Sequence, residues 1–328
     1  MRFTSDMAAS ADVETDIRDS VRYLSSRAAH ASIEVDPYWP KWDSPWWHLT
    51  ALLELGRIRD APEQIIAALI AAVNRHYAHV FPFRIEDVPA GYDPRMQIVC
   101  HCALGTVYQM VAAYGCDVDA ELPWARAWFV RYQLPDGGLS CDEAAYVRPE
   151  PHSSVVSTLP PLEAMLWHAP RPLTEQESAF LRRGADYLST RRLCRSARTG
   201  AVIDEGWLAL RFPRFYDYDV LRGLRFLVAW ADQGAAPLPS AAVAEACERL
   251  RTAFPDGRVA PGVQAWRGNV TLARQADGRW ERRPASGFAL LEKVGIPGRY
   301  NPWLTGQWTA AQVHLRALAE RGLLTGAR

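Results

Sequence analysis

Two kinds of helical segment alternate along the chain. Segments that are apolar on all sides span 45–55, 96–114, 153–167, 218–230 and 302–320. Segments with one polar stripe span 13–27, 62–77, 121–132, 175–192 and 240–254. A helix that is apolar all round is buried on both sides, whereas a one-faced helix covers a surface. The alternation predicts an all-α fold, an α/α toroid with about five inner helices in a ring and five outer helices around it.

A repeated turn supports this ring. Gly115 lies 21 residues before Asp136, and Gly234 lies 22 residues before Asp256. Each interval holds a helix-ending glycine, a polar turn, an amphipathic segment and then Pro-Asp-Gly. Equal spacing in unlike sequences indicates a repeated helix pair.

Local signals set the remaining boundaries. Ser44 and Asn301 each precede a proline, as expected where a helix begins, and Thr174 with Glu177 is typical of a capping box. Strand signals are few, and only 257–282 favours a hairpin, with its turn at 277–278. We expect a flexible tail over residues 1–12 and a single toroid domain over 13–328.

Composition excludes several classes of protein. Lys and Arg together number 37, and so do Asp and Glu, so the formal net charge is zero and a nucleic-acid partner is not expected. No run of about 18 apolar residues predicts a transmembrane segment. The first residues lack the apolar stretch of a signal peptide, so we expect a cytoplasmic protein whose six cysteines are thiols or metal ligands. The oligomeric state is not set by these features.

A resemblance to a known family adds to this interpretation. The sequence "QLPDGG" at 133–138, followed by Leu139, resembles the Q-x-x-x-G-W repeat of the squalene–hopene cyclase and protein prenyltransferase superfamily, with Leu139 where that repeat usually has Trp. The segments 36–56, 152–165 and 212–227 are similar to bacterial members of the group. The resemblance implies an α/α toroid. It also implies a terpenoid-cyclase-like enzyme, a cyclase, lyase, isomerase or transferase, acting on a small apolar or isoprenoid-type substrate in the toroid cavity.

The chain departs from the catalytic motifs of that superfamily. It has neither the Asp-x-Asp-Asp run of class II terpene cyclases nor the Asp-Asp-x-x-Asp run of class I enzymes. The Asp-x-Cys zinc pair of protein prenyltransferases is not reproduced, because Cys141 precedes Asp142. Asp117 and Asp119 come closest to a run, and Asp117 stands where a helix N-cap is expected.

Inner helices of an alternating ring run in the same direction, so their N-terminal ends should gather at one mouth. Cys102, Cys141 and His152 fall at those ends, and two thiolates with an imidazole form a partial zinc shell whose fourth position stays open. Cys100 or His101 could replace Cys102. Residues 100 and 102 would point to different faces of a helix, so both are not expected on one ion. The alternative is a core position for Cys102 and an N-cap position for His152.

Carboxyl groups near the start of the fourth inner helix are candidate acids. Asp217 and Asp219 follow several aromatic residues, and a carboxyl among rings has a raised pKa and can act as a general acid. The alternative is that Asp217 caps the helix and Asp219 strengthens its first turn. His48 is a third catalytic candidate, or else a core histidine.

Aromatic residues near the expected mouth are candidate cavity walls. The candidate substrate-binding residues are Trp39, Trp42, Trp46, Trp47, Tyr218 and Trp303. The dense tryptophan cluster at 39–47 could instead close the ring between its first and last repeats. Glu163 lies in an apolar helix and needs a partner, which Arg222 on the next inner helix could supply.

Three functions follow from these features. The first is a terpenoid-cyclase-like enzyme, and the second is a zinc-dependent transferase or lyase with a Cys/Cys/His site. The third is a non-catalytic toroid that binds a ligand or a peptide.

Overall fold

Helices dominate the fold. The computed structural model describes residues 3–35, 44–76, 100–146, 148–265, 271–274, 279–284 and 287–326. The inner helices are α3 (Pro45–Glu54), α5 (His101–Tyr114), α8 (Val155–His168), α10 (Val220–Gln233) and α13 (Pro302–Glu320). Each overlaps one of the segments predicted to be apolar on all sides, so the all-α prediction is confirmed. Burial on all sides is wrong for α13, of which only Leu304, Trp308, Ala311 and Leu318 are buried.

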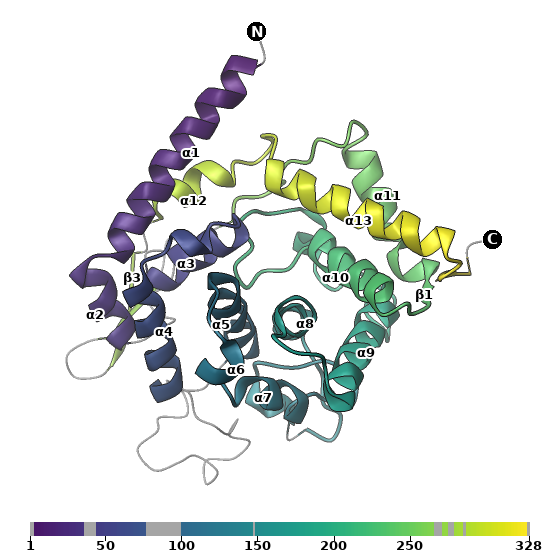
Figure 1. Ribbon diagram of the computed structural model, residues 1–328. Helices are drawn as coiled ribbons and strands as arrows, with labels where there is room; N and C mark the ends of the chain where they lie inside the picture. Colours follow the sequence, from purple (N-terminus) through teal and green to yellow (C-terminus); the bar gives the residue numbers. More distant parts are fainter. Residues whose placement is uncertain are drawn as a thin grey trace.

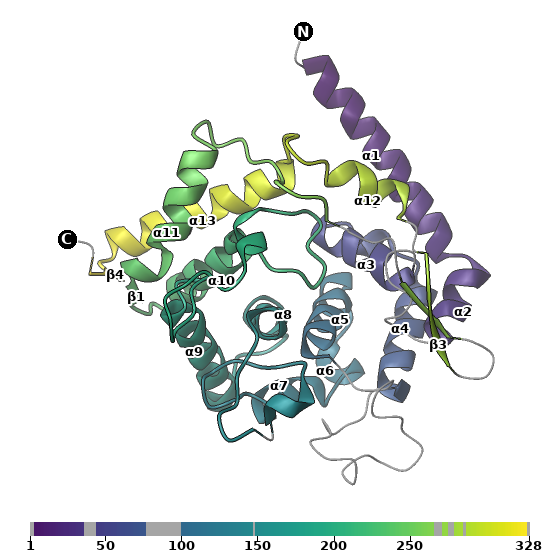
Figure 2. The ribbon, with the colours of Figure 1, turned by 180° about the vertical axis from the view of Figure 1, so that it is seen from behind.

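The outer helices cover this inner set. They are α1 (Phe3–Leu24), α4 (Glu63–His76), α7 (Ala125–Arg131), α9 (Glu175–Thr190) and α11 (Ser240–Ala253). Figures 1 and 2 both show α4, α7 and α9 outside α5 and α8. The helix α1 begins at Phe3, so most of the expected tail is helical, and its first half projects beyond the other helices (Figure 1).

Short elements complete the described chain. They are α2 (Arg27–Val35), α6 (Val118–Glu121), α12 (Ala289–Val294) and the 3-10 turns η1 (Ile58–Asp60), η3 (Glu143–Tyr146) and η4 (Glu205–Leu208). The strands β2 (Thr271–Arg274) and β3 (Trp280–Arg283) form the predicted antiparallel hairpin, whose turn lies outside the described residues. The strands β1 (Leu238–Pro239) and β4 (Leu324–Thr325) pair in parallel. Within the described ranges, no helix combines the length and apolarity needed to cross a membrane.

The two Pro-Asp-Gly turns have the same hydrogen bonds. In each, the glycine N–H donates to the carbonyl three residues earlier at 2.9 Å. The carboxylates of Asp136 and Asp256 each accept from the N–H two residues later, at 3.2 and 3.0 Å. Gly137 and Gly257 have φ values of 93° and 75°, in the region that favours glycine. The two Pro-Asp-Gly turns therefore match, whereas the glycines that begin the two intervals differ, with φ of 115° at Gly115 and −84° at Gly234.

A close contact between backbones joins α5 to α8. A Cβ atom on Gly105 would lie 2.5 Å from the carbonyl carbon of Pro160 and 2.5 Å from the nitrogen of Pro161. Prolines inside a helix lack the N–H that normally bonds to the preceding turn. Gln109 on α5 donates to the Pro160 carbonyl at 3.0 Å. The two helices are therefore fixed against each other at a point with no side chain between them.

The chain between η4 and α10 runs toward α3 and α5 and back (Figures 1 and 2). The Glu54 carboxylate at the end of α3 accepts the backbone N–H groups of Arg214 and Phe215 at 2.7 to 2.9 Å. Phe215 has a φ of 55°, an uncommon conformation for a residue with a side chain. The hydrogen bonds to Glu54 offset the free-energy cost of the Phe215 conformation and keep residues 214 and 215 among the inner helices.

Replacing Gly105 with Ala tests the contact between α5 and α8. The added methyl group would overlap the backbone of α8, so we expect G105A to lower the free energy of unfolding by about 1–3 kcal/mol. Urea denaturation measures this change. The matched control is G306A in α13, where the new Cβ meets nothing within 4 Å. G306A should be neutral or stabilising, and equal effects of the two substitutions would contradict the packing argument.

Candidate functional site

Three cysteine sulfurs converge at the start of α5. The Cys100 Sγ lies 2.8 Å from the Sγ of Cys102 and 2.8 Å from that of Cys141, and the last two are 3.8 Å apart. Zinc binds thiolates at about 2.3 Å, so a tetrahedral site places its sulfurs roughly 3.8 Å apart. One pair already has that separation, and the others would need to open by about 1 Å. We call these three residues the cysteine trio, and their donor set fits a thiophilic metal ion.

Cys100 joins the trio because it precedes the helix. It is the N-cap of α5, with φ −61° and ψ 124°, and the helix begins at His101. The prediction that residues 100 and 102 point to different faces assumed a helix from residue 96. The backbone at Cys100 is extended instead, so its sulfur reaches the sulfur of Cys102.

His152 is exposed on the stretch before α8 and is not part of the trio. Its neighbour Ser153 is anchored, because the Ser153 N–H donates to Asp136 at 3.2 Å and the Tyr187 hydroxyl donates to the Ser153 carbonyl at 3.0 Å. The third donor is therefore Cys100 rather than the predicted His152. The N-cap of α8 is Ser154, so the alternative capping position for His152 is also not the one observed.

His101 supports the trio without supplying a ligand. Its Nδ1 accepts the indole N–H of Trp128 at 3.0 Å, and its Nε2 lies 2.9 Å from the hydroxyl of Tyr146. An indole N–H can only donate, so Nδ1 carries no proton and Nε2 carries it in the neutral ring. Burial lowers the pKa of His101 to about 4, which keeps the ring neutral.

Tyr146 fixes the loop that carries Cys141. Its hydroxyl lies 3.1 Å from the carbonyl of Tyr132 and 3.2 Å from that of Ser140, and it accepts the Ser140 N–H at 3.2 Å. The Cys141 N–H donates to the Ser157 hydroxyl on α8 at 3.0 Å. The loop is thus tied to α5, α8 and the end of α7. Nothing in the sequence spacing indicated Tyr146 or Ser157.

The thiols of the cysteine trio differ in pKa. Hydrogen bonds to Cys100 and Cys141, together with burial, raise the pKa of Cys102 well above its ordinary value. Burial also opposes ionisation of Cys141, but hydrogen bonds from the other two thiols lower its pKa well below the ordinary range. Cys141 is therefore the thiolate of the group, and a thiolate is the form that binds metal.

The candidate acids are paired with arginines. Asp219 is fully buried, bonds to the Arg214 Nε at 2.7 Å and accepts the Arg222 N–H as the N-cap of α10. Asp217 pairs with Arg211 at 2.7 Å. Asp219 is therefore the residue that caps the helix, a role expected of Asp217, and Asp217 lies before the helix in an ion pair.

His48 packs in the core. Its ring stacks on Phe288 at 3.7 Å and lies 4.5 Å from the ring of Tyr23. Burial lowers its pKa to about 3, so the imidazole is neutral. Its position matches the core alternative rather than a catalytic role.

The aromatic candidates are packed against other rings and backbone. Trp46, Trp47 and Tyr218 are at most 2% exposed. The rings of Trp303 and Phe212 stack at 5.3 Å. Trp47 meets Phe215 edge-on at 4.4 Å, and the Tyr218 hydroxyl donates to the Leu193 carbonyl. Trp39 and Trp42 lie outside the described residues.

A cavity of about 250 Å³ lies among the inner helices. All five inner helices and the segment before α10 contribute to its lining, which includes Glu54, Glu163, Arg214, Arg222 and Arg225. Arg222 and Glu163 form the predicted pair, with Nη2 and Oε2 at 2.6 Å. We call this space the central cavity, and its lining combines these charged groups with apolar side chains such as Leu53 and Phe215.

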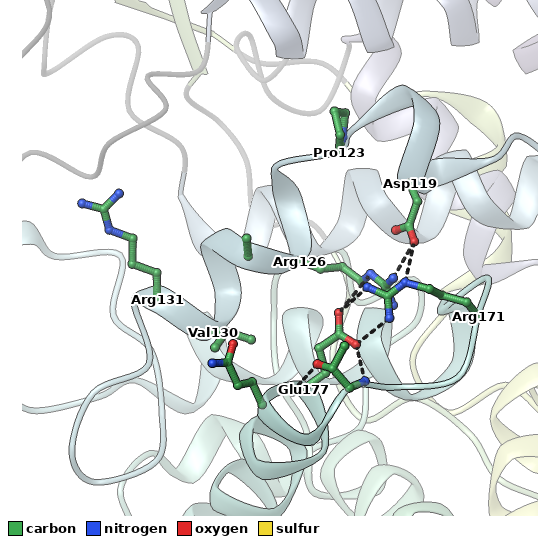
Figure 3. A pocket seen from close by; sticks show the side chains of 10 residues that line it. Asp119, Pro123, Arg126, Val130, Arg131, Arg171 and Glu177 are labelled. Atoms are coloured by element: carbon green, nitrogen blue, oxygen red, sulfur yellow. Dashed lines mark hydrogen bonds and ion pairs between the residues drawn. The ribbon is translucent and has the colours of Figure 1, made fainter.

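A second pocket, of about 530 Å³, lies on the outer layer among α6, α7 and α9 (Figure 3). Arg126 and Arg171 point between Asp119 and Glu177 and pair with both. Glu177 also completes the predicted capping box with Thr174. The charges balance within this group, which joins the outer helices to one another. Asp117 caps α6, as expected.

Comparison of the chain with protein-family models, with curated proteins and with solved structures finds no match.

The pKa of His48 predicts a pH dependence of stability. Its pKa falls from 6.5 to about 3 in the folded chain, so below pH 6.5 only the unfolded chain binds this proton. The free energy of unfolding should therefore decline as the pH falls through this window, by up to about 1.4 kcal/mol per pH unit from this residue. In H48F this part of the decline disappears, as measured by urea denaturation across the window. H152F, at an exposed histidine, is the control and should keep the full decline.

Proposed function

We propose that the chain binds one zinc ion through Cys100, Cys102 and Cys141 and acts as a zinc-dependent transferase or lyase on a thiol-bearing or isoprenoid-type substrate. The observation that carries this proposal is the convergence of three sulfurs from two separate segments. Three protein ligands leave the fourth tetrahedral position for water or substrate, as in catalytic rather than structural zinc sites.

Accessibility supports a reactive site. Cys100 and Cys141 are half-buried, whereas Cys102 is 4% exposed. A zinc ion held there would favour the ionised form of a thiol or water in the fourth position and so supply a nucleophile at neutral pH. The three thiolates would carry the charge that retains the ion, and Cys102 would anchor it on the buried side.

The surrounding residues would position the ligands and the substrate. Tyr146 and His101 fix the Cys141 loop. Tyr216 lies on the segment before α10, where burial and the negative charge of Asp217 raise its pKa to about 12. Its phenol therefore keeps its proton near the trio and is suited to donate a hydrogen bond to substrate.

The geometry favours this chemistry over acid-initiated cyclisation. A class II cyclase reaction needs a protonated carboxyl facing the substrate, and both Asp217 and Asp219 are paired with arginines. The charged lining of the central cavity also suits polar ligands better than a hydrocarbon chain. The resemblance to the cyclase and prenyltransferase superfamily stays a prediction, and a thiol-directed transferase agrees with its prenyltransferase branch.

Metal analysis tests the proposal directly. We expect one zinc per purified chain by inductively coupled plasma mass spectrometry, and loss of that zinc in C100S, C102S and C141S. C247S removes another buried cysteine, on α11, and should keep the metal, as should H152A. A chain that is purified without metal and takes up no added Zn²⁺ would contradict the proposal.

Replacing Tyr146 with Phe tests the support of the Cys141 loop. Y146F removes the hydroxyl that meets His101, Tyr132 and Ser140, while the ring is kept. Loss of an outer-shell partner typically weakens metal affinity by about 10- to 100-fold, and we expect a loss in this range. Competition with a chromophoric chelator measures the affinity. Unchanged affinity in a folded Y146F protein would show that the loop holds its position without this hydroxyl.

A further inference from the structure

We propose that the central cavity binds a small organic molecule bearing one carboxylate, held by Arg225 and Arg214. The site is separate from the cysteine trio, so this inference goes beyond the proposed function and does not depend on it. Two arginines with unused hydrogen-bonding capacity line this one cavity.

Arg225 is the first of these. It is half-buried, and its guanidinium lies 5.0 Å from the ring centre of Trp167. Within the described ranges, no hydrogen bond or ion pair joins it to another residue. Burial lowers its pKa to about 10, the charge of Glu163 opposes this effect, and the neighbouring positive charges of Arg214 and Arg222 add to it. An anion in the cavity would supply the missing partner.

Arg214 is the second, and it is 2% exposed. Its Nε bonds to Asp219 at 2.7 Å and its Nη1 to Gln307 at 2.7 Å. Its Nη2 is buried and meets no acceptor in the part of the chain that the structure describes. A buried donor without an acceptor costs about 1–3 kcal/mol. A ligand oxygen at this atom would remove that cost.

The charge of the lining favours a carboxylate over a phosphate. Three arginines and two glutamates face the cavity, and Asp219 lies behind Arg214. The residues that face the cavity therefore carry one more positive than negative formal charge, which one carboxylate would balance. A phosphate monoester carries roughly −1.5 to −2 at neutral pH, which is more than this arrangement balances.

The size and the remaining lining limit the rest of the ligand. The cavity of about 250 Å³ corresponds to roughly eight water molecules at about 30 Å³ each, so the ligand has few heavy atoms. Thr50, Thr106, Gln109 and Gln307 add neutral hydrogen-bonding groups. Trp167 and His168 are half-buried at the end of α8 and mark the side from which a ligand would enter. A short hydroxy- or keto-acid fits these features.

Ligand-observed saturation-transfer NMR on the full chain tests the inference. The probes are acetate, glycolate and pyruvate, titrated separately to millimolar concentration, with acetamide as the uncharged analogue and inorganic phosphate as the alternative anion. We expect saturable binding of at least one carboxylate, weaker or no binding of acetamide, and an increase in melting temperature with the bound carboxylate. No saturable binding of any of the three, or tighter binding of phosphate, would overturn the inference.

Arginine variants locate the site. R225Q should weaken carboxylate binding by at least about tenfold, because a charge-assisted hydrogen-bonded pair is lost. R225K keeps the positive charge, so its affinity for the carboxylate should lie between those of the unmodified chain and R225Q. R182Q makes the same change at an exposed arginine on α9 and should bind as the unmodified chain does. Circular dichroism confirms that each variant is folded, and wild-type affinity in folded R225Q would overturn the assignment.

Discussion

Buried charges hold the segment before α10 in place among the inner helices. Arg214 bonds to Asp219, and its backbone N–H is accepted by Glu54 on α3. Buried ion pairs stabilise a fold only where their remaining donors and acceptors are also satisfied. Asp219 meets this condition, because it also accepts the backbone N–H groups of Arg211 and Arg222. The arrangement depends on residues from α3, the connecting segment and α10 at once, and it shapes the central cavity.

Most of the helical architecture could be predicted from the sequence, because burial on all sides and burial on one side leave different periodicities. The pairing of Glu163 with Arg222 was also predictable, since an acid in an apolar helix needs a partner. Helix ends were less predictable. The start of α5 at His101 depends on tertiary contacts of its first turn, including the Trp128 bond, and these leave no periodic signal.

The candidate metal site was predictable only in part. Cys102 and Cys141 were expected near one mouth, because inner helices in a ring start at the same end. Helix geometry predicts that Cys100 and Cys102 cannot bind the same ion, but this geometry does not apply to Cys100, because it is an N-cap residue. His152 was chosen from its place at a helix start. Hydrogen bonds between Ser153 and both Asp136 and Tyr187 fix the backbone next to His152. Only the fold brings those residues together, so the sequence does not indicate these bonds.

The two candidate sites share the helix α5 but use different parts of it. Cys102 lies in its first turn, and Gln109, which lines the central cavity, lies seven residues later, about 10 Å along the axis. On the facing segment, Arg214 lines the cavity, whereas Tyr216 interacts electrostatically with the trio. Only Phe215 separates them in the chain. An anion that changed the hydrogen bonding of Arg214 would therefore act two residues away from Tyr216, on the same segment.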